Sequence, residues 1–344
     1  MGINISDIIP RKEIQLEDLK GNIIAIDAFN TIYQFLTTIR QMDGTPLMDK
    51  KGRITSHLSG LFYRNLNLLV AGVKPVYVFD GKPPELKEEE IKRRMEAKQE
   101  AKEKYEEAKA KGDTKAMRRF SAQFTRITDE IIAESKELLS AMGIPVIQAL
   151  GEGEAEAAHL SRNSLAWASA SQDYDSLLYG ATRLVRNLTL ARKRKTSSGA
   201  YVDVNIELIE FESLLNQLQI NKDQLICLGI LVGTDYNPGG VKGIGQKTAL
   251  EIVRKYQYPV AIFDYIKNSP KFSSGLTFDW QEIYKQFHEY ECCSTTRSFD
   301  FKQPDKEKIR EILSEHDFSE ERISSALQKL DEEREKGKQK KLFT

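Results

Sequence analysis

The stretch NIIAIDA, residues 22–28, decides the fold class of this chain of 344 residues. It is almost continuously apolar and rich in isoleucine, as expected of a strand that is covered on both faces of a parallel sheet. Four further apolar runs alternate with helical patterns along the N-terminal two thirds of the chain. They span residues 75–80, 144–148, 166–171 and 183–190. The alternation predicts an α/β fold with a central, mainly parallel, twisted sheet that is flanked by helices.

Helical patterns lie between and beyond these strands. Residues 55–71 carry leucines and a phenylalanine at a period near 3.6 residues, which predicts a helix. After Asp203 the pattern becomes almost wholly helical, over 223–232, 246–255, 278–288 and 306–329. The final residues, 331–344, are highly charged and predict a flexible tail.

The overall composition excludes several classes of protein. The chain has 51 Lys plus Arg and 51 Asp plus Glu, so its net charge of zero indicates neither a basic nucleic-acid-binding chain nor an acidic disordered one. At 40% hydrophobic residues it is an ordinary globular chain, and no apolar run approaches the ~20 residues of a membrane span. The N-terminus has no signal-peptide pattern, and the three cysteines lack zinc spacing. These features predict an intracellular protein without a membrane anchor.

Residues 82–126 differ from the rest of the chain in composition. They include 14 basic and 10 acidic residues among 45, few apolar ones, and a long helix-favouring run of Lys, Glu and Ala. One interpretation is a solvated helical hairpin or a single charged helix. The other is a mobile insertion over a functional site.

Acidic residues stand at or just after the carboxyl ends of four predicted strands. They are Asp27, Asp80, Glu152, Glu154, Asp173 and Asp175. Each one alone is readily explained as a helix cap or a turn residue. Together they converge at the carboxyl edge of one sheet, where α/β proteins bind ligands, and like charges at short range need a cation.

The type of ligand indicates the type of metal. Carboxylates without a neighbouring His or Cys favour Mg²⁺ or Mn²⁺ over zinc. The four histidines are scattered without metal-binding spacing, and a Ser-His-Asp triad has no support. Carboxylates that hold two Mg²⁺ ions about 4 Å apart can activate a water molecule and stabilise a leaving oxygen. The sequence therefore predicts metal-dependent chemistry on a phosphate.

The run VKGIGQKTA, residues 241–249, lies between two helical patterns. It differs from a phosphate-binding P-loop because the required lysine is missing and a helix precedes the run. A helix-hairpin-helix turn explains it better, since its glycines allow close approach to a DNA phosphate and the following helix donates N–H groups. The alternative is a Gly-rich connector without a ligand. The residues predicted to contact DNA are Lys242, Gly243, Gly245, Lys247 and Thr248.

Four motifs, taken in order, closely resemble the flap endonuclease family of structure-specific 5′ nucleases, and the archaeal type most of all. They are FDGKPP at 79–84, GEGEAEAA at 151–158, ASQDYDSLLYG at 170–180 and LVGTDYNPGGVKGIGQKTA at 231–249. The resemblance extends from Gly2 to about residue 330 and implies the PIN-like 5′ nuclease fold.

The resemblance also implies a domain organisation, with one nuclease domain over 1–330. Its implied parts are an N-terminal part (1–81), a helical gateway and arch (82–136), an internal part (137–220), a helix-hairpin-helix region (221–260), a helical C-terminal part (261–330) and a tail (331–344).

The resemblance implies that seven carboxylates bind two Mg²⁺ ions, for which Mn²⁺ can substitute. These are Asp27, Asp80, Glu152, Glu154, Asp173, Asp175 and Asp235. This chain departs from the family motif, since Gly151 replaces a serine and Glu156 adds a third acid. Residues i and i+2 do not share a helix face, so Glu152 and Glu154 both reach the metals only if they straddle a loop and the first helical turn. The other register pairs Glu154 with Glu156.

Further residues have roles that the resemblance implies. Lys87 and Arg94 are two helical turns apart and are implied to act on the scissile phosphate, at the base of an arch over the single-stranded flap. Tyr33 is implied to stack on an unpaired base, although a buried aromatic explains it equally well without the family. Arg64 is implied to contact a phosphate beside a hydrophobic wedge, and Gly2, if Met1 is removed, to lie near the metals.

The C-terminus carries a shortened form of a family motif. Family tails often contain Gln-x-x-aliphatic-x-x-aromatic-aromatic, which binds a sliding clamp. Here Gln339, Leu342 and Phe343 match its first part, and the chain ends before the second aromatic position. The implied partner is a PCNA-type sliding clamp.

As a whole, the resemblance implies a monomeric, Mg²⁺-dependent 5′ flap endonuclease with 5′–3′ exonuclease activity. Its implied substrate is branched DNA with a 5′ flap, removed in replication, including Okazaki fragment maturation, and in repair. It would act in the cytoplasm of a prokaryote or archaeon, or in a eukaryotic nucleus. One alternative is a related nuclease that prefers gaps, bubbles or four-way junctions, against which the short arch argues. The other is a non-catalytic DNA-junction binding protein, against which the seven carboxylates argue.

Overall fold

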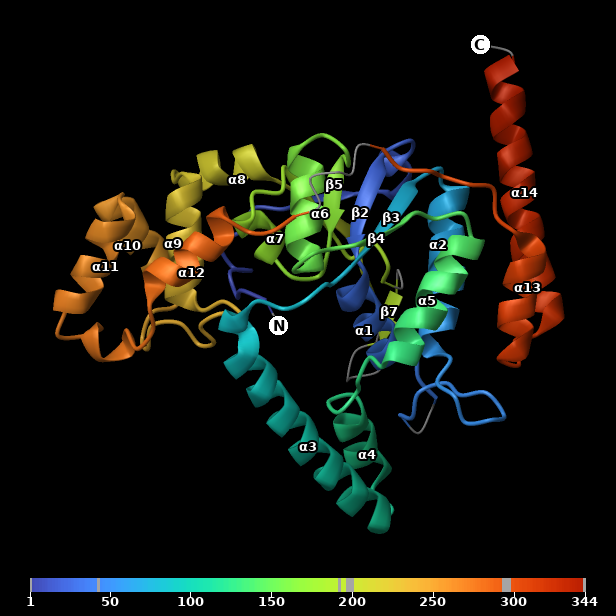
Figure 1. Cartoon of the computed structure of the whole chain (residues 1–344), viewed down its shortest axis with the longest axis horizontal. Coiled ribbons are helices and arrows are strands. Elements are labelled where there is room, and N and C mark those ends of the chain that lie inside the picture. The colour runs from blue at the N-terminus through green and yellow to red at the C-terminus, as the bar shows by residue number, and fades with distance from the viewer. Residues whose placement is uncertain (1, 42–43, 191–192, 196–200, 293–297, 343–344) are drawn as a thin grey trace.

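A seven-stranded, mainly parallel sheet forms the centre of the molecule. The computed structural model describes residues 2–41, 44–190, 193–195, 201–292 and 298–342 (Figure 1). The strand order is β1-β9-β6-β5-β2-β3-β4, in which β9 pairs antiparallel with both neighbours and the other pairs are parallel. The predicted α/β fold class is confirmed. The strands of this sheet are β1 (Lys12–Ile14), β2 (Ile23–Asp27), β3 (Lys74–Phe79), β4 (Val146–Gln148), β5 (Ala168–Ala170), β6 (Arg183–Arg186) and β9 (Ile206–Glu210).

Strand β2 shows how the sequence builds this sheet. Ile24 and Ile26 pack on one face with the cluster around α1 and α2, while Ala25 packs on the other face with α6. All three side chains are at most 1% exposed, so the strand is covered on both faces as its apolar run predicts. β2 pairs in parallel with β3 up to Asp27 opposite Val78, and with β5 on its other side. The carboxyl ends of the three strands therefore meet at one edge of the sheet.

Two strands of the sheet, β1 and β9, were not predicted from the sequence. β1 and β9 pair antiparallel, with Lys12 opposite Leu208, although they lie far apart in the chain. The prediction of an almost wholly helical chain after Asp203 is wrong for Ile206–Glu210. This strand has five residues and runs directly into a helix, so its alternating pattern is too short to recognise in the sequence. A separate hairpin of β7 (Lys193–Lys195) and β8 (Tyr201–Asp203) also lies outside the predicted strands.

Helices cover both faces of the sheet. On the face of Ile26, α1 and α2 lie nearest the strands, and α5, α13 and α14 pack beside and behind α2. On the face of Ala25, α6 crosses β2, β3 and β5. The predicted helix over 55–71 is α2. The helices named here are α1 (Ala28–Thr38), α2 (Ser56–Val70), α5 (Asp129–Ala141), α6 (Gly153–Arg162), α13 (Lys306–Glu315) and α14 (Glu320–Leu342).

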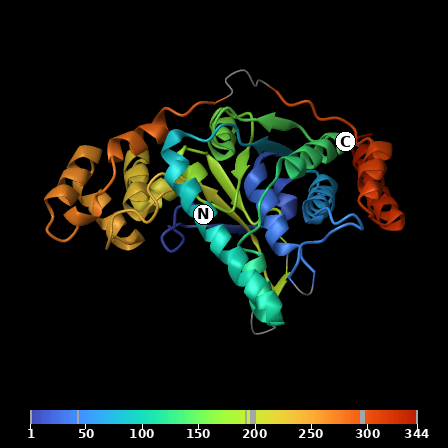
Figure 2. The same ribbon diagram turned by 60° about the horizontal axis from the view of Figure 1, so that its bottom comes forward.

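The charged segment forms a helical hairpin that projects from the body of the molecule (Figures 1 and 2). It consists of α3 (Glu88–Ala110) and α4 (Thr114–Ser121), joined by a turn in which Gly112 has a positive φ of 69°. Buried Ala101, Tyr105 and Ala108 hold it together, with the Tyr105 ring 5.1 Å from that of Phe124. Of the two interpretations, the helical hairpin therefore describes its conformation.

A second helical group lies at the opposite end of the molecule from α13 and α14 (Figures 1 and 2). The loop between α9 and α10 is the predicted helix-hairpin-helix turn. The group and its approach consist of α7 (Asp175–Leu178), α8 (Phe211–Leu218), α9 (Lys222–Val232), α10 (Gln246–Tyr256), α11 (Pro259–Asn268) and α12 (Trp280–His288). Three short 3₁₀ turns complete the described elements, at Leu16–Leu19, Glu85–Lys87 and Ser273–Gly275.

The C-terminal region differs from the prediction in two ways. The helical range 306–329 is broken between α13 and α14, where Asp317 has a positive φ of 60°. Backbone helix then continues to Leu342, whereas the charged composition predicts a flexible tail from Asp331. Buried Ile323, Leu327 and Leu330 anchor α14 on the body, and adding Lys and Glu residues to an existing helix costs less than starting one. Over the described ranges, no helix is long and apolar enough to cross a membrane.

Candidate active site

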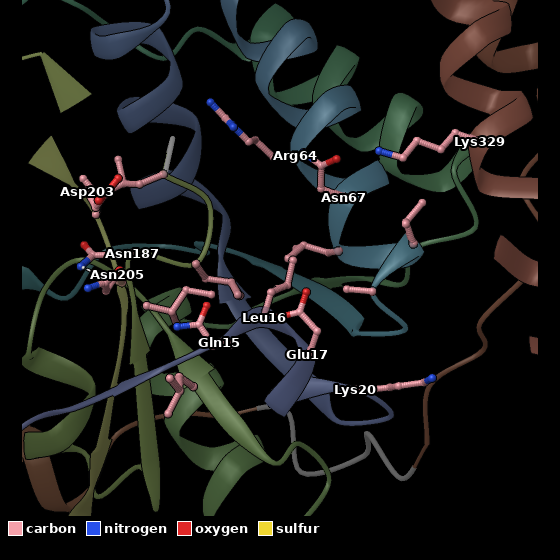
Figure 3. A pocket seen from close by; sticks show the side chains of 18 residues that line it. Gln15, Leu16, Glu17, Lys20, Arg64, Asn67, Asn187, Asp203, Asn205 and Lys329 are labelled. Carbon is pink, nitrogen blue, oxygen red and sulfur yellow. Dashed lines mark hydrogen bonds between the residues drawn. The ribbon is translucent and has the colours of Figure 1, made fainter. Parts of the chain in front are cut away.

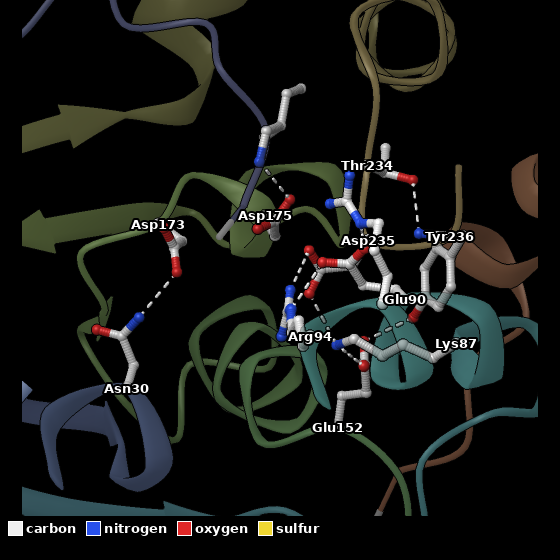
Figure 4. A network of polar contacts seen from close by, with 12 residues as sticks. Asn30, Lys87, Glu90, Arg94, Glu152, Asp173, Asp175, Thr234, Asp235 and Tyr236 are labelled. Atoms are coloured by element: carbon white, nitrogen blue, oxygen red, sulfur yellow. Dashed lines mark hydrogen bonds and ion pairs between the residues drawn. The ribbon is translucent and has the colours of Figure 1, made fainter. Parts of the chain in front are cut away.

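Three aspartates stand at the carboxyl edge of the parallel strands, as the sequence predicts. Asp27 ends β2 and caps α1, where it accepts a hydrogen bond from the Asn30 N–H at 3.0 Å. Asp80 follows β3 and accepts one from the Gly153 N–H at 2.7 Å. Asp173 follows β5 and accepts one from the Asn30 side chain at 2.8 Å (Figure 4). Helix starts and side-chain donors thus fix all three at the same edge.

The start of α6 brings two glutamates to this edge. Glu152 is the residue before the helix and Glu154 lies in its first turn, so the two straddle the loop and the helix in the predicted way. A side chain at Gly153 would place its Cβ 2.7 Å from an Asp80 oxygen, so only glycine fits here. Glu156 is fully buried further along α6, and its charge acts on His159 and Tyr290. The arrangement groups Glu152 and Glu154 with the aspartates.

Asp175 and Asp235 join the site from other parts of the chain. Asp175 begins α7 and accepts a hydrogen bond from the Ile3 N–H at 3.1 Å. A Cβ on Gly2 would lie 1.8 Å from an Asp175 oxygen, so the chain's second residue packs directly on this carboxylate. Asp235 follows α9 and completes the set of seven.

The crowded carboxylates have strongly perturbed acidities. Burial, followed by the charge of Asp80, raises the pKa of Asp27 from its ordinary value of 3.8 to about 8. Burial together with the charges of Asp173 and Asp235 raises the pKa of Asp175 to about 7. Burial also raises the pKa of Asp80 to about 6, against the hydrogen bond from Gly153. For Glu154, burial and then the charges of Asp175 and Glu152 raise the pKa well above its ordinary value. These groups repel one another in a site that lacks enough positive charge.

Lys87 and Arg94 from the base of the arch supply part of that charge (Figure 4). The Lys87 ammonium pairs with Glu152 and lies 3.1 Å from Asp235. The Arg94 guanidinium donates to Asp235 at 2.7 Å and to Glu90 at 2.7 Å. Burial opposes the ionised form of Asp235, but the charges of Lys87 and Arg94 outweigh it and lower the pKa of this carboxyl. The arch is therefore tied to the carboxylates at two points.

The donor set fits a hard divalent cation, although the side chains do not close around one. All seven residues offer carboxylate oxygens, as Mg²⁺ and Mn²⁺ prefer. Within the described part of the chain, no three His, Cys, Asp or Glu side chains come close enough together to hold a metal ion. The Lys87 ammonium lies between Glu152 and Asp235, and hydrogen bonds from Asn30, Gly153 and Ile3 hold other carboxylates. A cation that bound between Glu152 and Asp235 would have to displace the Lys87 ammonium.

These pKa values predict how the metal-free protein responds to pH. Above about pH 4 the folded protein keeps protons that the unfolded chain has lost, on Asp80 up to about pH 6, on Asp175 up to about pH 7 and on Asp27 up to about pH 8. These groups therefore lower the free energy of unfolding as pH rises through those ranges. Asp27→Asn, which can still cap α1, removes one such group. In urea unfolding with EDTA, the stability advantage of Asp27→Asn over wild type is expected to grow from pH 5 to pH 8. Histidines with lowered pKa values act in both proteins and cancel, so a constant difference would contradict the shift assigned to Asp27.

The predicted DNA contacts Tyr33 and Arg64 lie on two different helices, α1 and α2. Tyr33 on α1 is 37% exposed, with the Lys98 ammonium 5.5 Å from its ring centre, so it is not a buried aromatic. Arg64 on α2 is half-buried and lines a cavity of about 900 Å³ with Asn67 and Lys329 (Figure 3). Burial lowers the pKa of its guanidinium, which has no ion-pair partner among the described residues. Both side chains are therefore available to a ligand.

The turn before α10 has the geometry that its glycines predict. Val241 and Ile244 are buried and anchor the loop, and the Ile244 N–H donates to the Val241 carbonyl. Gly243 has a positive φ of 87°, a conformation that favours glycine. The predicted contact residues around this anchor are exposed or partly exposed. They are Lys242, Gly243, Gly245, Lys247 and Thr248.

Other residues of the site were not predicted from sequence. Asn30 and Glu90 hold Asp173 and Arg94, and two tyrosines, Tyr179 and Tyr236, donate to Glu152. Tyr236 directly follows Asp235, and Asn30 lies three residues after Asp27, so proximity to a carboxylate was their only sequence signal.

In the predicted clamp motif, Gln339 and Leu342 belong to the backbone of α14, and Phe343 lies outside the described residues.

The chain is similar to known nucleases over nearly its whole length. The chain matches the XPG N-terminal domain over residues 1–101 and the XPG I-region over residues 143–235. It is 52% identical to flap endonuclease 1 of Pyrococcus furiosus over 99% of this chain and 98% of the relative. The solved flap endonuclease-1 of Methanococcus jannaschii is 40% identical, with a TM-score of 0.73 over 96% of this chain and 98% of that one. The catalytic core of Rad2 in complex with DNA substrate is 25% identical, with a TM-score of 0.71 over 96% of this chain and 100% of that one. The chain therefore belongs to the flap endonuclease family, of the archaeal type.

Proposed function

We propose that this protein removes 5′ flaps from branched DNA by hydrolysing one phosphodiester bond with the help of two Mg²⁺ ions. The activity of a structure-specific 5′ nuclease follows from membership of the family. The observation that carries the metal-dependent step is the set of seven carboxylates at one edge of the sheet, with the pKa of Asp27 raised to about 8. Such a site is electrostatically incomplete without cations.

The proposed ligands divide between strand ends and helix starts. Asp27, Asp80, Glu152, Glu154, Asp173, Asp175 and Asp235 would hold the metals, which when bound supply a nucleophilic water and stabilise the leaving 3′ oxygen. Support comes from the rigid attachment of these residues: Asp27 caps α1, and backbone N–H groups of Gly153 and Ile3 hold Asp80 and Asp175. Mn²⁺ is expected to substitute, because it accepts the same oxygen donors.

Lys87 and Arg94 would act on the scissile phosphate. Both reach the carboxylates from the base of the arch, so a phosphate bound beside Asp235 would lie within reach of their cationic groups. On binding, the phosphate would replace Glu152 and Asp235 as their anionic partner. Two positive groups aimed at the phosphate would stabilise the charge that develops in the transition state.

The duplex and the flap would contact separate surfaces. Lys242, Gly243, Gly245, Lys247 and Thr248 would hold a duplex backbone, since exposed glycines at a helix start let phosphates approach the N–H groups. Tyr33 would stack on an unpaired base and Arg64 would contact a phosphate.

We further propose the division into a nuclease domain over 1–330 with its arch at 82–136, and a tail whose Gln339, Leu342 and Phe343 bind a PCNA-type clamp. We also propose a monomer in a reducing intracellular compartment, since three cysteines do not make a disulfide framework.

A panel of labelled DNA substrates tests the function. Wild-type protein in Mg²⁺ is expected to cut a double-flap substrate at least tenfold faster than gapped, bubble or four-way substrates of the same sequence. Asp175→Ala serves as the inactive control. If wild type cuts the flap no faster than this control but still binds it, the protein is a junction-binding protein. A faster rate on gaps, bubbles or four-way junctions would assign it to a related nuclease instead.

A further inference from the structure

Two tyrosine hydroxyls converge on one oxygen of Glu152. The Tyr236 hydroxyl lies 2.6 Å from Glu152 Oε2 and the Tyr179 hydroxyl lies 3.0 Å from the same atom. The two hydroxyls are 2.5 Å apart. Tyr179 is fully buried and Tyr236 is 8% exposed, so water does not compete for these contacts. The other oxygen of Glu152, Oε1, faces the Lys87 ammonium (Figure 4).

The hydroxyls can act only as a unit. Two phenols carry two hydrogens for three short contacts, so either both donate to Glu152 or one donates to the other, which in turn donates to Glu152. In each case at least one charge-assisted hydrogen bond holds Oε2.

The tyrosines connect three proposed metal ligands. Tyr236 directly follows Asp235, and Tyr179 lies one helical turn after Asp175. Each segment that carries one carboxylate therefore also carries a donor to Glu152. The Phe287 ring of α12 packs against both phenols, at 4.9 Å from Tyr179 and 5.4 Å from Tyr236. The rings cannot turn away without disturbing this aromatic cluster.

We propose that Tyr179 and Tyr236 are positioning residues that occupy Glu152 Oε2 and thereby present Oε1 alone to the cation position. This inference rests on the proposed role of Glu152 as a metal ligand. A carboxylate held at one oxygen binds a metal through the other in a fixed direction, whereas a free one rotates and loses affinity. Partners of this kind typically contribute 10- to 100-fold in metal affinity or activity.

Tyr290 provides a matched control. Its ring packs 5.0 Å from Tyr179, yet its hydroxyl is buried without a hydrogen-bond partner among the described residues. Tyr290→Phe therefore removes a hydroxyl from the same cluster without touching Glu152. Tyr179→Phe and Tyr236→Phe keep the rings and remove only the hydroxyls that reach the carboxylate.

Electron paramagnetic resonance of bound Mn²⁺ tests the proposal. The sample is the full chain with flap DNA whose scissile linkage cannot be hydrolysed. Tyr236→Phe and Tyr179→Phe are each expected to weaken Mn²⁺ binding about tenfold. The same variants should raise the Mg²⁺ concentration for half-maximal cleavage of ordinary flap DNA by a similar factor, while the KM for DNA and the melting temperature stay close to those of Tyr290→Phe. In a Glu152→Gln background, adding either change should have no further effect.

Three outcomes separate the proposals. The positioning role alone would be overturned if both variants bound Mn²⁺ as tightly as Tyr290→Phe does, while wild type bound Mn²⁺ and cut flap DNA normally. An equal loss of affinity with and without Glu152 would also overturn it, since the tyrosines would then act elsewhere. If wild type itself neither binds Mn²⁺ nor cuts flap DNA, the proposed function fails instead.

Discussion

Glu154→Gln is expected to lower the rate of flap cleavage on the order of 10,000-fold at saturating DNA and Mg²⁺. Glu154 is partly buried among the other proposed ligands, and burial with the charges of Asp175 and Glu152 raises its pKa. Glutamine keeps the size of the side chain but removes the negative charge that a metal would neutralise. Single-turnover cleavage of a labelled double-flap substrate measures the effect without a contribution from product release.

Glu156→Gln is the control for this variant. Glu156 lies on the same helix and is fully buried, and its charge acts on His159 and Tyr290. Its cleavage rate is expected to remain within about fivefold of wild type, with the melting temperature recorded to account for any loss of folding. A collapse of activity in Glu156→Gln together with a near-normal Glu152→Gln would reverse the register and pair Glu154 with Glu156.

Lys87→Ala is expected to lower the cleavage rate about a thousandfold, with a small change in the KM for DNA. Removing one preorganised donor to a developing negative charge typically costs 10²- to 10³-fold, and Lys87 is a fully charged donor in a buried site. Lys92→Ala is the matched control, because Lys92 lies in the first turns of α3, which begins directly after Lys87, but is exposed. A loss confined to KM would show that Lys87 only binds DNA.

The same variant reports on the metal-free state. Lys87 pairs with Glu152 and lies 3.1 Å from Asp235, so its removal leaves one buried and one partly buried carboxylate with less positive charge. Lys87→Ala is therefore expected to melt at a lower temperature than wild type in EDTA, and Mg²⁺ is expected to narrow the difference. Thermal unfolding at pH 8 with and without Mg²⁺ measures this, and an identical melting temperature in EDTA would contradict the ion pairs.

Much of the fold could be predicted from the sequence because its central strands are local signals. An apolar run such as residues 22–28 requires burial on both faces, and only a parallel sheet between helices supplies that. The two neighbouring strands at one end of the sheet, β1 and β9, were missed for the converse reason. β1 and β9 are short and gain their stability from pairing with each other across the chain, with Lys12 opposite Leu208, which no local window contains.

Some features of the candidate site could likewise be predicted from the sequence, and others could not. The positions of Asp27 and Asp80 at strand ends were predictable, since the ends of parallel strands share one edge of a sheet. The tyrosine contacts to Glu152 were not, because a buried tyrosine has the same local pattern whether its hydroxyl meets a carboxylate or nothing. Tyr179 and Tyr290 illustrate this, as only the first reaches Glu152.

The sequence by itself determined which residues are available: the acids that end strands, the glycines of the hairpin turn, the charged hairpin of the arch, and membership of a nuclease family. The tertiary structure alone decided which of them meet. Arg94 reaches Asp235 across 141 residues of chain, and Lys87 lies between Glu152 and Asp235. Local sequence reports whether a side chain must be buried or can be charged, because burial and helix periodicity act over a few residues. Which charges neutralise one another depends on packing between distant segments, which only the folded chain fixes.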